Sequence, residues 1–103
     1  MALPLLEEFT KQPVETFPIA IEFAGRLPPG ASLASGTATG RVAATLATDN
    51  SILFSQTVTV DGTLAKVRVQ NGTDGILYKI SFVMTLSDNS ILEEDVLMDV
   101  VNR

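Results

Sequence analysis

Residues 74–101 read DGILYKISFVMTLSDNSILEEDVLMDVV, and this stretch decides the fold. From residue 76 to residue 86 the side chains alternate with a period of two, which is the period of a β-strand and not of a helix. The apolar face of this strand comprises Ile76, Tyr78, Ile80, Phe82, Met84 and Leu86. Residues 87–90, Ser-Asp-Asn-Ser, are typical of a turn. A second strand follows, and its apolar face comprises Leu92, Val96, Met98 and Val100.

The register of this hairpin can be predicted from burial. A two-residue loop at residues 88–89 would place Phe82 opposite Asp95, whereas a loop of three or five residues shifts the pairing by one residue. Because a slip of one residue turns a whole strand over, we expect the second register. It predicts these inner pairs: Phe82 with Val96, Ile80 with Met98, and Tyr78 with Val100. It predicts these outer pairs: Lys79 with Asp99, Val83 with Asp95, and Leu97 with Ser81.

The entry to the first strand has a recognisable pattern. Asp74, Tyr78 and Ile80 form D-x-x-x-Y-x-I, which resembles the start of strand F in immunoglobulin domains. In those domains a cysteine stands where Ile80 stands here. The pattern predicts a tyrosine corner without a disulfide, in which the Tyr78 hydroxyl group binds nearby backbone.

Composition limits the chemistry that the chain can perform. The 103 residues are enough for one domain, and they include no cysteine and no histidine. This excludes disulfides and the usual zinc, haem and iron–sulfur ligand sets, so we expect no cofactor. The net charge of −5 with scattered basic residues does not favour nucleic-acid binding. No apolar run is long enough to span a membrane, and no secretory signal is visible, so we expect synthesis in the cytoplasm.

Residues 1–13 are predicted to form an N-terminal arm, followed by one domain over residues 14–103. The arm carries three apolar side chains, Leu3, Leu5 and Leu6, and is interrupted by Pro4 and Pro13. One interpretation is a frayed terminus. The other is an apolar arm that docks on a partner subunit or on the domain itself.

Further strands are expected along the chain. Residues 16–23 alternate, and Pro18 restricts that strand to an edge or to a position with its empty side outward. Strands are also expected at residues 32–39 and 42–46, although a short helix over residues 41–47 is the alternative. Residues 52–60 and 65–70 alternate clearly, with Phe54 on the inner face, and are separated by the turn signal Asp61-Gly62. We therefore predict an all-β chain that folds as an immunoglobulin-like antiparallel β-sandwich of about seven strands, with a small closed barrel as the alternative.

The charged and glycine residues do not predict a catalytic site. Glu93, Glu94 and Asp95 form a charge run with Asp99, and calcium prefers such oxygen ligands. On a strand, however, Glu94 points away from its neighbours, and a solvated face that protects an edge is the simpler interpretation. The glycines fit no phosphate-binding spacing, and no histidine can activate a serine or threonine. We expect a protein that is not an enzyme.

Several short motifs together resemble a known group of proteins. They are K-x-P-x-E at residues 11–15, L-P-x-G at 27–30, S-G-T at 35–37, N-G-T-D-G-x-x-Y-x-I at 71–80, T-L-S-D at 85–88 and E-D-V-L-M-x-V at 94–100. In this order they resemble the small immunoglobulin-like structural proteins of tailed bacteriophages and prophages. The resemblance implies a virion component at the neck, the tail or the head surface, including head decoration. It assigns no individual functional residue.

The expected work of such a module is contact with other virion proteins. Leu77, Val83 and Leu97 would lie on the outer face of the last hairpin, and this face or the arm is the candidate interface. Association with further copies of the chain is left open. A cell-surface or carbohydrate-binding module is the alternative, but the chain has no tryptophan and its single tyrosine is assigned to the corner.

Overall fold

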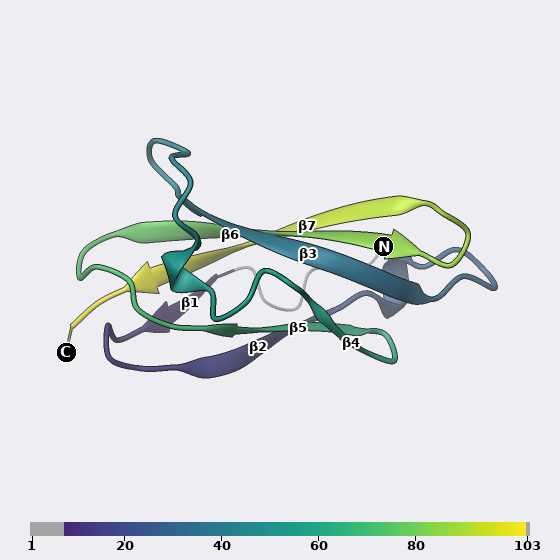
Figure 1. The fold of residues 1–103 in the computed structure, drawn as a ribbon, viewed down its shortest axis with the longest axis horizontal. Coiled ribbons are helices and arrows are strands. Elements are labelled where there is room, and N and C mark those ends of the chain that lie inside the picture. The colour runs from purple at the N-terminus through teal and green to yellow at the C-terminus, as the bar shows by residue number, and fades with distance from the viewer. Residues whose placement is uncertain (1–7, 103) are drawn as a thin grey trace.

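The computed structural model describes residues 8–102, which form two β-sheets that face each other (Figure 1). The larger sheet has the strand order β1-β7-β6-β3 and the smaller sheet has the order β2-β5-β4. The strands are β1 (Glu8–Lys11), β2 (Phe17–Glu22), β3 (Leu33–Val42), β4 (Thr59–Asp61), β5 (Leu64–Val69), β6 (Leu77–Leu86) and β7 (Ile91–Val100). Within the described part of the chain the only helical segments are two short 3-10 turns, η1 (Ala24–Arg26) and η2 (Asn50–Ile52). The predicted all-β class is therefore correct, and the arrangement is consistent with a β-sandwich.

One apolar core fills the space between the sheets. The larger sheet supplies more of this core than the smaller sheet. The alternation along β6 explains its share, because every second residue from Tyr78 to Leu86 is buried. The core residues of β6 and β7 are Tyr78, Ile80, Phe82, Met84, Leu86, Val96, Met98 and Val100. The smaller sheet adds Ile19, Ile21, Ala65, Val67 and Val69. Each sheet therefore keeps an outer face that does not take part in the core.

The register of the β6–β7 hairpin differs from the predicted one by two residues. Ile80 pairs with Val96, not with Met98, and Phe82 lies opposite Glu94. The backbone N–H of Leu86 donates to the carbonyl oxygen of Ser90 over 2.8 Å, so the loop comprises residues 87–89. Asn89 adopts a left-handed conformation with φ 71°, as the last residue of a three-residue hairpin loop commonly does. A shift of two residues keeps every side chain on its predicted face, so burial cannot distinguish these two registers.

The hydrogen bond predicted for a tyrosine corner is formed by Tyr78. The backbone N–H of Thr73 donates to the Tyr78 hydroxyl group over 2.9 Å, and Tyr78 is buried. Asp74 accepts a hydrogen bond of 2.8 Å from the backbone N–H of Asn102, which ties the C-terminal end of the chain to the same corner. Gly72 has a positive φ of 98°, and a Cβ atom there would lie 2.7 Å from the side chain of Val100. Close packing at the corner therefore requires glycine at this position.

Part of the predicted N-terminal arm belongs to the larger sheet. Glu8–Lys11 form β1, which pairs in parallel with residues 97–100 of β7. Lys11 is fully buried, and its ammonium group donates to the carbonyl oxygens of Gln12, Pro13 and Asn71. Leu3, Leu5 and Leu6 lie outside the described residues.

The expected strand over residues 42–46 is wrong, and so is the alternative helix. One strand, β3, continues to Val42, and residues 43–45 then form a turn. This turn belongs to a loop that projects beyond the larger sheet (Figure 1). Ala43 donates to the carbonyl oxygen of Leu77, and Val42 donates to that of Ala47, so the base of the loop is closed by backbone hydrogen bonds.

The expected continuous strand over residues 52–60 is also wrong. Leu53 forms a bridge with Val69 of β5, but Thr57 forms a bridge with Thr37 of β3. The backbone of residues 56–58 hydrogen-bonds to residues 36–38 along the outer edge of β3, and the chain returns to β5 only at β4. This path supplies partners for an edge of the larger sheet that would otherwise be open.

Two further residues, Pro18 and Arg26, lie at edges of the sheets. Pro18 lies in β2, which is an edge strand as predicted. Arg26 of η1 bonds to Glu94 of β7 over 2.8 Å and also donates to the carbonyl oxygen of Glu93. Because Glu94 lies beyond the end of β1, this pair joins η1, which follows β2, to the edge of β7 that faces away from β6.

Candidate functional site

The outer face of the larger sheet brings the three predicted interface residues together. Leu77 and Val83 project from β6 and Leu97 projects from β7, all on the side away from the core. Ile91 joins them, because it pairs with Thr85 next to Val83 and is 65% exposed. We call these four residues the outer apolar set. The sequence pattern did not assign Ile91 to this set.

Charged side chains separate the members of the outer apolar set. The cross-strand partners on this face are Lys79 for Leu97, Glu93 for Val83 and Asp99 for Leu77. The predicted outer pairs are therefore wrong. Lys79 contacts Asp95 at 3.5 Å. Glu93 and Asp99 have no ion pair among the described residues. The face is therefore partly apolar, with unpaired acidic groups along β7.

The projecting loop stands at one end of this face. Its residues 43–48 follow β3, and Figure 1 shows the loop on the outer side of the larger sheet. Leu46 in this loop is 57% exposed and has a positive φ of 60°. A leucine in the left-handed region is strained by roughly 1–2 kcal/mol, and such strain is often found at binding sites. The projecting loop and the outer apolar set therefore lie on the same side of the larger sheet.

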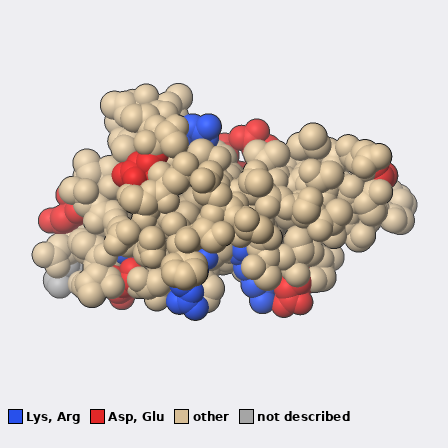
Figure 2. All heavy atoms as spheres, in the orientation of Figure 1, with Lys and Arg blue, Asp and Glu red and all other residues tan. Residues whose placement is uncertain are grey.

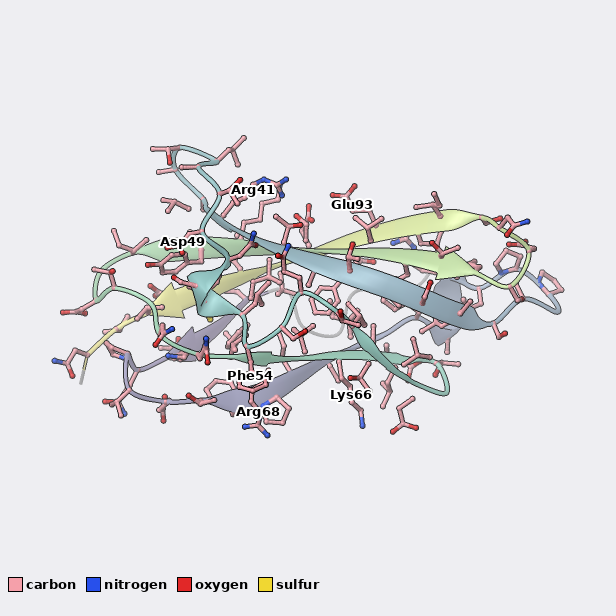
Figure 3. The ribbon with its side chains drawn as sticks, in the orientation of Figure 1. Arg41, Asp49, Phe54, Lys66, Arg68 and Glu93 are labelled. Atoms are coloured by element: carbon pink, nitrogen blue, oxygen red, sulfur yellow. The ribbon has the colours of Figure 1, made fainter. Side chains whose placement is uncertain are left out.

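A second surface lies on the opposite side of the molecule, and sequence reasoning missed it. Pro18 of β2 pairs with Arg68 of β5, and the backbone N–H of Phe54 donates to the carbonyl oxygen of Arg68 over 2.9 Å. Figure 3 shows Phe54 and Arg68 on the side of the smaller sheet that faces away from the larger sheet. Phe54 is 69% exposed, although the alternation of residues 52–60 placed it inside. We call Pro18, Phe54 and Arg68 the small-sheet row.

Basic side chains lie beside the smaller sheet and beside the projecting loop (Figure 2). Figure 3 identifies Lys66 and Arg68 at the first place and Arg41 at the second. Lys66 is bound to Asp61 at 2.8 Å. Arg41 and Arg68 have no ion pair among residues 8–102.

The described residues contain neither a pocket nor a group of three or more acidic side chains placed to hold a metal ion. They also contain no helix that could cross a membrane. The one tyrosine is buried in the corner, so it cannot stack on a sugar at the surface. Among the described residues, the surfaces that a partner could contact include the two outer sheet faces and the projecting loop.

Comparison with known protein families identifies a match over most of the chain. Residues 11–99 match the family model described as podophage GP4 fiber-tail adaptor protein gp77. The match includes β2 to β6, most of β7 and the buried Lys11. Comparisons with curated proteins and with solved structures give no match.

Proposed function

Because the chain belongs to the podophage GP4 fiber-tail adaptor protein gp77 family, we propose that it is an adaptor that binds another protein of the phage tail through the outer face of its larger sheet. Membership of this family makes the chain a structural protein of a phage tail and a component of the virion. The family role is structural, and we infer that the chain performs no catalysis. The family does not favour a cell-surface or carbohydrate-binding module.

The outer apolar set is the observation that supports this interface. Leu77, Val83, Ile91 and Leu97 lie on adjacent strands and are accompanied by charged side chains, which is the mixture found at non-obligate protein interfaces. A rigid sheet presents these side chains without a large loss of conformational entropy on binding.

The size of the face indicates that it does not act alone. The strands β3, β6 and β7 have 10 residues each, so at about 3.4 Å per residue and about 4.8 Å spacing they cover about 34 Å by about 10 Å, and with the four residues of β1 the face measures roughly 400 Å². A standard interface buries about 800 Å² on each partner. We therefore include the projecting loop, with the exposed Leu46, in the proposed interface. Leu3, Leu5 and Leu6 of the arm stay a prediction for a further contact.

We also propose that the topology is immunoglobulin-like. Immunoglobulin domains place strands C, F and G in one sheet and strands B, E and D in the other. The order β3-β6-β7 corresponds to C-F-G, and the order β2-β5-β4 corresponds to B-E-D. The hydrogen bond of Tyr78 at the start of β6, which corresponds to strand F, supports the same assignment.

Substitution of the outer apolar set tests the proposed interface. Val83→Lys and Leu97→Lys each introduce a charge on the outer face without touching the core, so both variants should fold and neither should be incorporated into particles. Val14→Lys is the matched control, because Val14 is 87% exposed and lies on neither outer face. Incorporation is measured by quantitative mass spectrometry of purified particles, and folding by circular dichroism. Normal incorporation of both outer-face variants would disprove the proposed interface.

The same measurement on wild-type particles gives the copy number. We expect about six to twelve copies for a position at the neck or at the attachment of fibers, since closed rotational symmetry is common in protein assemblies. Hundreds of copies would instead indicate the tail tube or the head surface. Absence of the protein from particles would contradict the adaptor role.

A further inference from the structure

We propose that the small-sheet row, Pro18, Phe54 and Arg68, is a second docking surface, which binds a virion protein that presents a carboxylate beside an apolar side chain. This inference rests on the proposed adaptor function, because an adaptor must hold two different proteins. The row lies on the sheet opposite to the outer apolar set. The two surfaces can therefore be occupied at the same time.

The row is continuous across three adjacent segments of backbone. Pro18 and Arg68 are direct cross-strand partners, so their side chains share the outer face of the smaller sheet. Phe54 follows on the other side of Arg68, joined by the backbone hydrogen bond of 2.9 Å. At about 4.8 Å between neighbouring strands, the row spans roughly 10 Å. This length suits contact with a short extended segment of a partner.

The backbone that presents Phe54 is held firmly. Ile52 and Leu53 are buried immediately before it. Gln70 donates its backbone N–H to the carbonyl oxygen of Ile52, and its side chain donates to the carbonyl oxygens of Ser51 and Leu53. An aromatic side chain on a fixed backbone loses little conformational entropy when a partner covers it, and it contributes a large apolar area.

Arg68 indicates the chemistry of the partner. The chain has a net charge of −5, yet the guanidinium group of Arg68 is exposed and has no ion pair among the described residues. The neighbouring Lys66 differs, because its ammonium group is already bound to Asp61. A guanidinium group binds a carboxylate through two parallel hydrogen bonds. Arginine and aromatic residues are also the residues most enriched at the energetic centres of protein interfaces.

Other occupants fit the surface less well. A nucleic-acid backbone would meet a single unpaired cation and would be repelled by the acidic chain. A second copy of the chain could offer the acidic residues of β7, such as Glu93 and Asp99. Repeated contact between opposite faces of one chain generates a ring or an open filament, and it would also cover the outer apolar set that the proposed function needs free. We therefore assign the row to a different protein.

Site-specific photo-cross-linking in assembled particles tests the proposal. p-Benzoylphenylalanine replaces Phe54 in one variant, Leu97 in a second and Val14 in a third, which serves as the exposed control. We expect position 54 to capture one virion protein and position 97 to capture a different one. Capture of the same protein from both positions, capture of only this chain from position 54, or capture at position 97 alone would each overturn the second surface. Capture at position 54 alone would support it and would contradict the interface proposed for the larger sheet.

The charge requirement is tested separately by Arg68→Glu and Arg68→Lys. Because the side chain is exposed, both variants should fold like the wild type by circular dichroism. Arg68→Glu should lower the yield of the cross-link from position 54 about tenfold or more, whereas Arg68→Lys, which keeps the charge but loses the paired hydrogen bonds, should lower it less. Equal yields from the two variants would show that no carboxylate binds there. The yield from position 97 should not change, which distinguishes this effect from failure of the proposed function.

Discussion

Replacement of Lys11 by methionine tests how β1 is held on the sandwich. The Lys11 side chain is fully buried, and its three ammonium protons are matched by three carbonyl oxygens, those of Gln12, Pro13 and Asn71. The acceptor at Asn71 is 60 residues away in the chain, so this one side chain connects the N-terminal strand to the loop before the tyrosine corner. Methionine has a similar length but cannot donate a hydrogen bond.

The expected destabilisation follows from the groups that lose their partner. A buried acceptor left without a donor costs about 1–3 kcal/mol, and up to three are involved here. Removal of the buried charge acts in the opposite direction: burial lowers the pKa of Lys11, although the carboxylate of Glu15 acts to raise it. We therefore expect a net loss of about 2–4 kcal/mol, because some of the carbonyl groups will regain water. At about 4–8 °C per kcal/mol for a domain of this size, Tm should fall by roughly 8–32 °C.

The assay is thermal and urea unfolding followed by circular dichroism. Lys79→Met is the matched control, because Lys79 makes a partly exposed contact of 3.5 Å with Asp95 on the outer face. The control should change stability by no more than about 1 kcal/mol. If Lys11→Met were no more destabilising than Lys79→Met, the three carbonyl groups would not be satisfied by Lys11 in solution, and the reasoning would be refuted.

Three further substitutions test other parts of the fold. Tyr78→Phe removes the acceptor of the Thr73 N–H and should cost about 1–2 kcal/mol in urea unfolding, and a variant of wild-type stability would contradict a role for the corner. Gly40→Ala would place a Cβ atom 2.5 Å from the carbonyl oxygen of Asp49 and should cost about 1–3 kcal/mol, unless the 3-10 turn moves away, which a crystal structure of the variant would detect. Hydrogen bonds from the residue two positions later lower the pKa of Asp88 below its ordinary value of 3.8. The stability that this carboxylate contributes is therefore complete above that value and is lost as pH falls through the lowered pKa. Asp88→Asn keeps an acceptor oxygen but should remove this part of the acid dependence between about pH 6 and pH 2. If the difference in the free energy of unfolding between the variant and the wild type stayed constant over that range, this role of the Asp88 carboxylate would be contradicted.

The candidate interface was predictable in part. Leu77, Val83 and Leu97 lie on the outer face as their alternation with buried residues predicted. Their neighbours were not predictable, because a shift of two residues between β6 and β7 changes every cross-strand partner and no side chain's face. The loop that sets this register depends on the left-handed conformation of Asn89, for which the Ser-Asp-Asn-Ser sequence offered several equivalent placements.

Phe54 shows where local pattern reasoning failed. Residues 52–60 alternate well enough to predict a straight strand, with Phe54 inside. In the structure the backbone leaves β5 after this residue and supplies hydrogen bonds to residues 36–38 of β3. The backbone groups at the edge of β3 require hydrogen-bond partners, and this requirement outweighed the local alternation. Phe54 therefore lies at the surface.

The sequence by itself determined the properties that depend on neighbours along the chain. The period of two determined which residues of β2, β5, β6 and β7 face the core, and the lack of cysteine and histidine limited the chemistry. Only the tertiary structure decided the strand order, the hairpin register, the parallel pairing of β1 and the small-sheet row. The physical reason is that alternation is a property of one strand, whereas each of these features depends on which distant segment satisfies the hydrogen-bonding groups at a strand's edge.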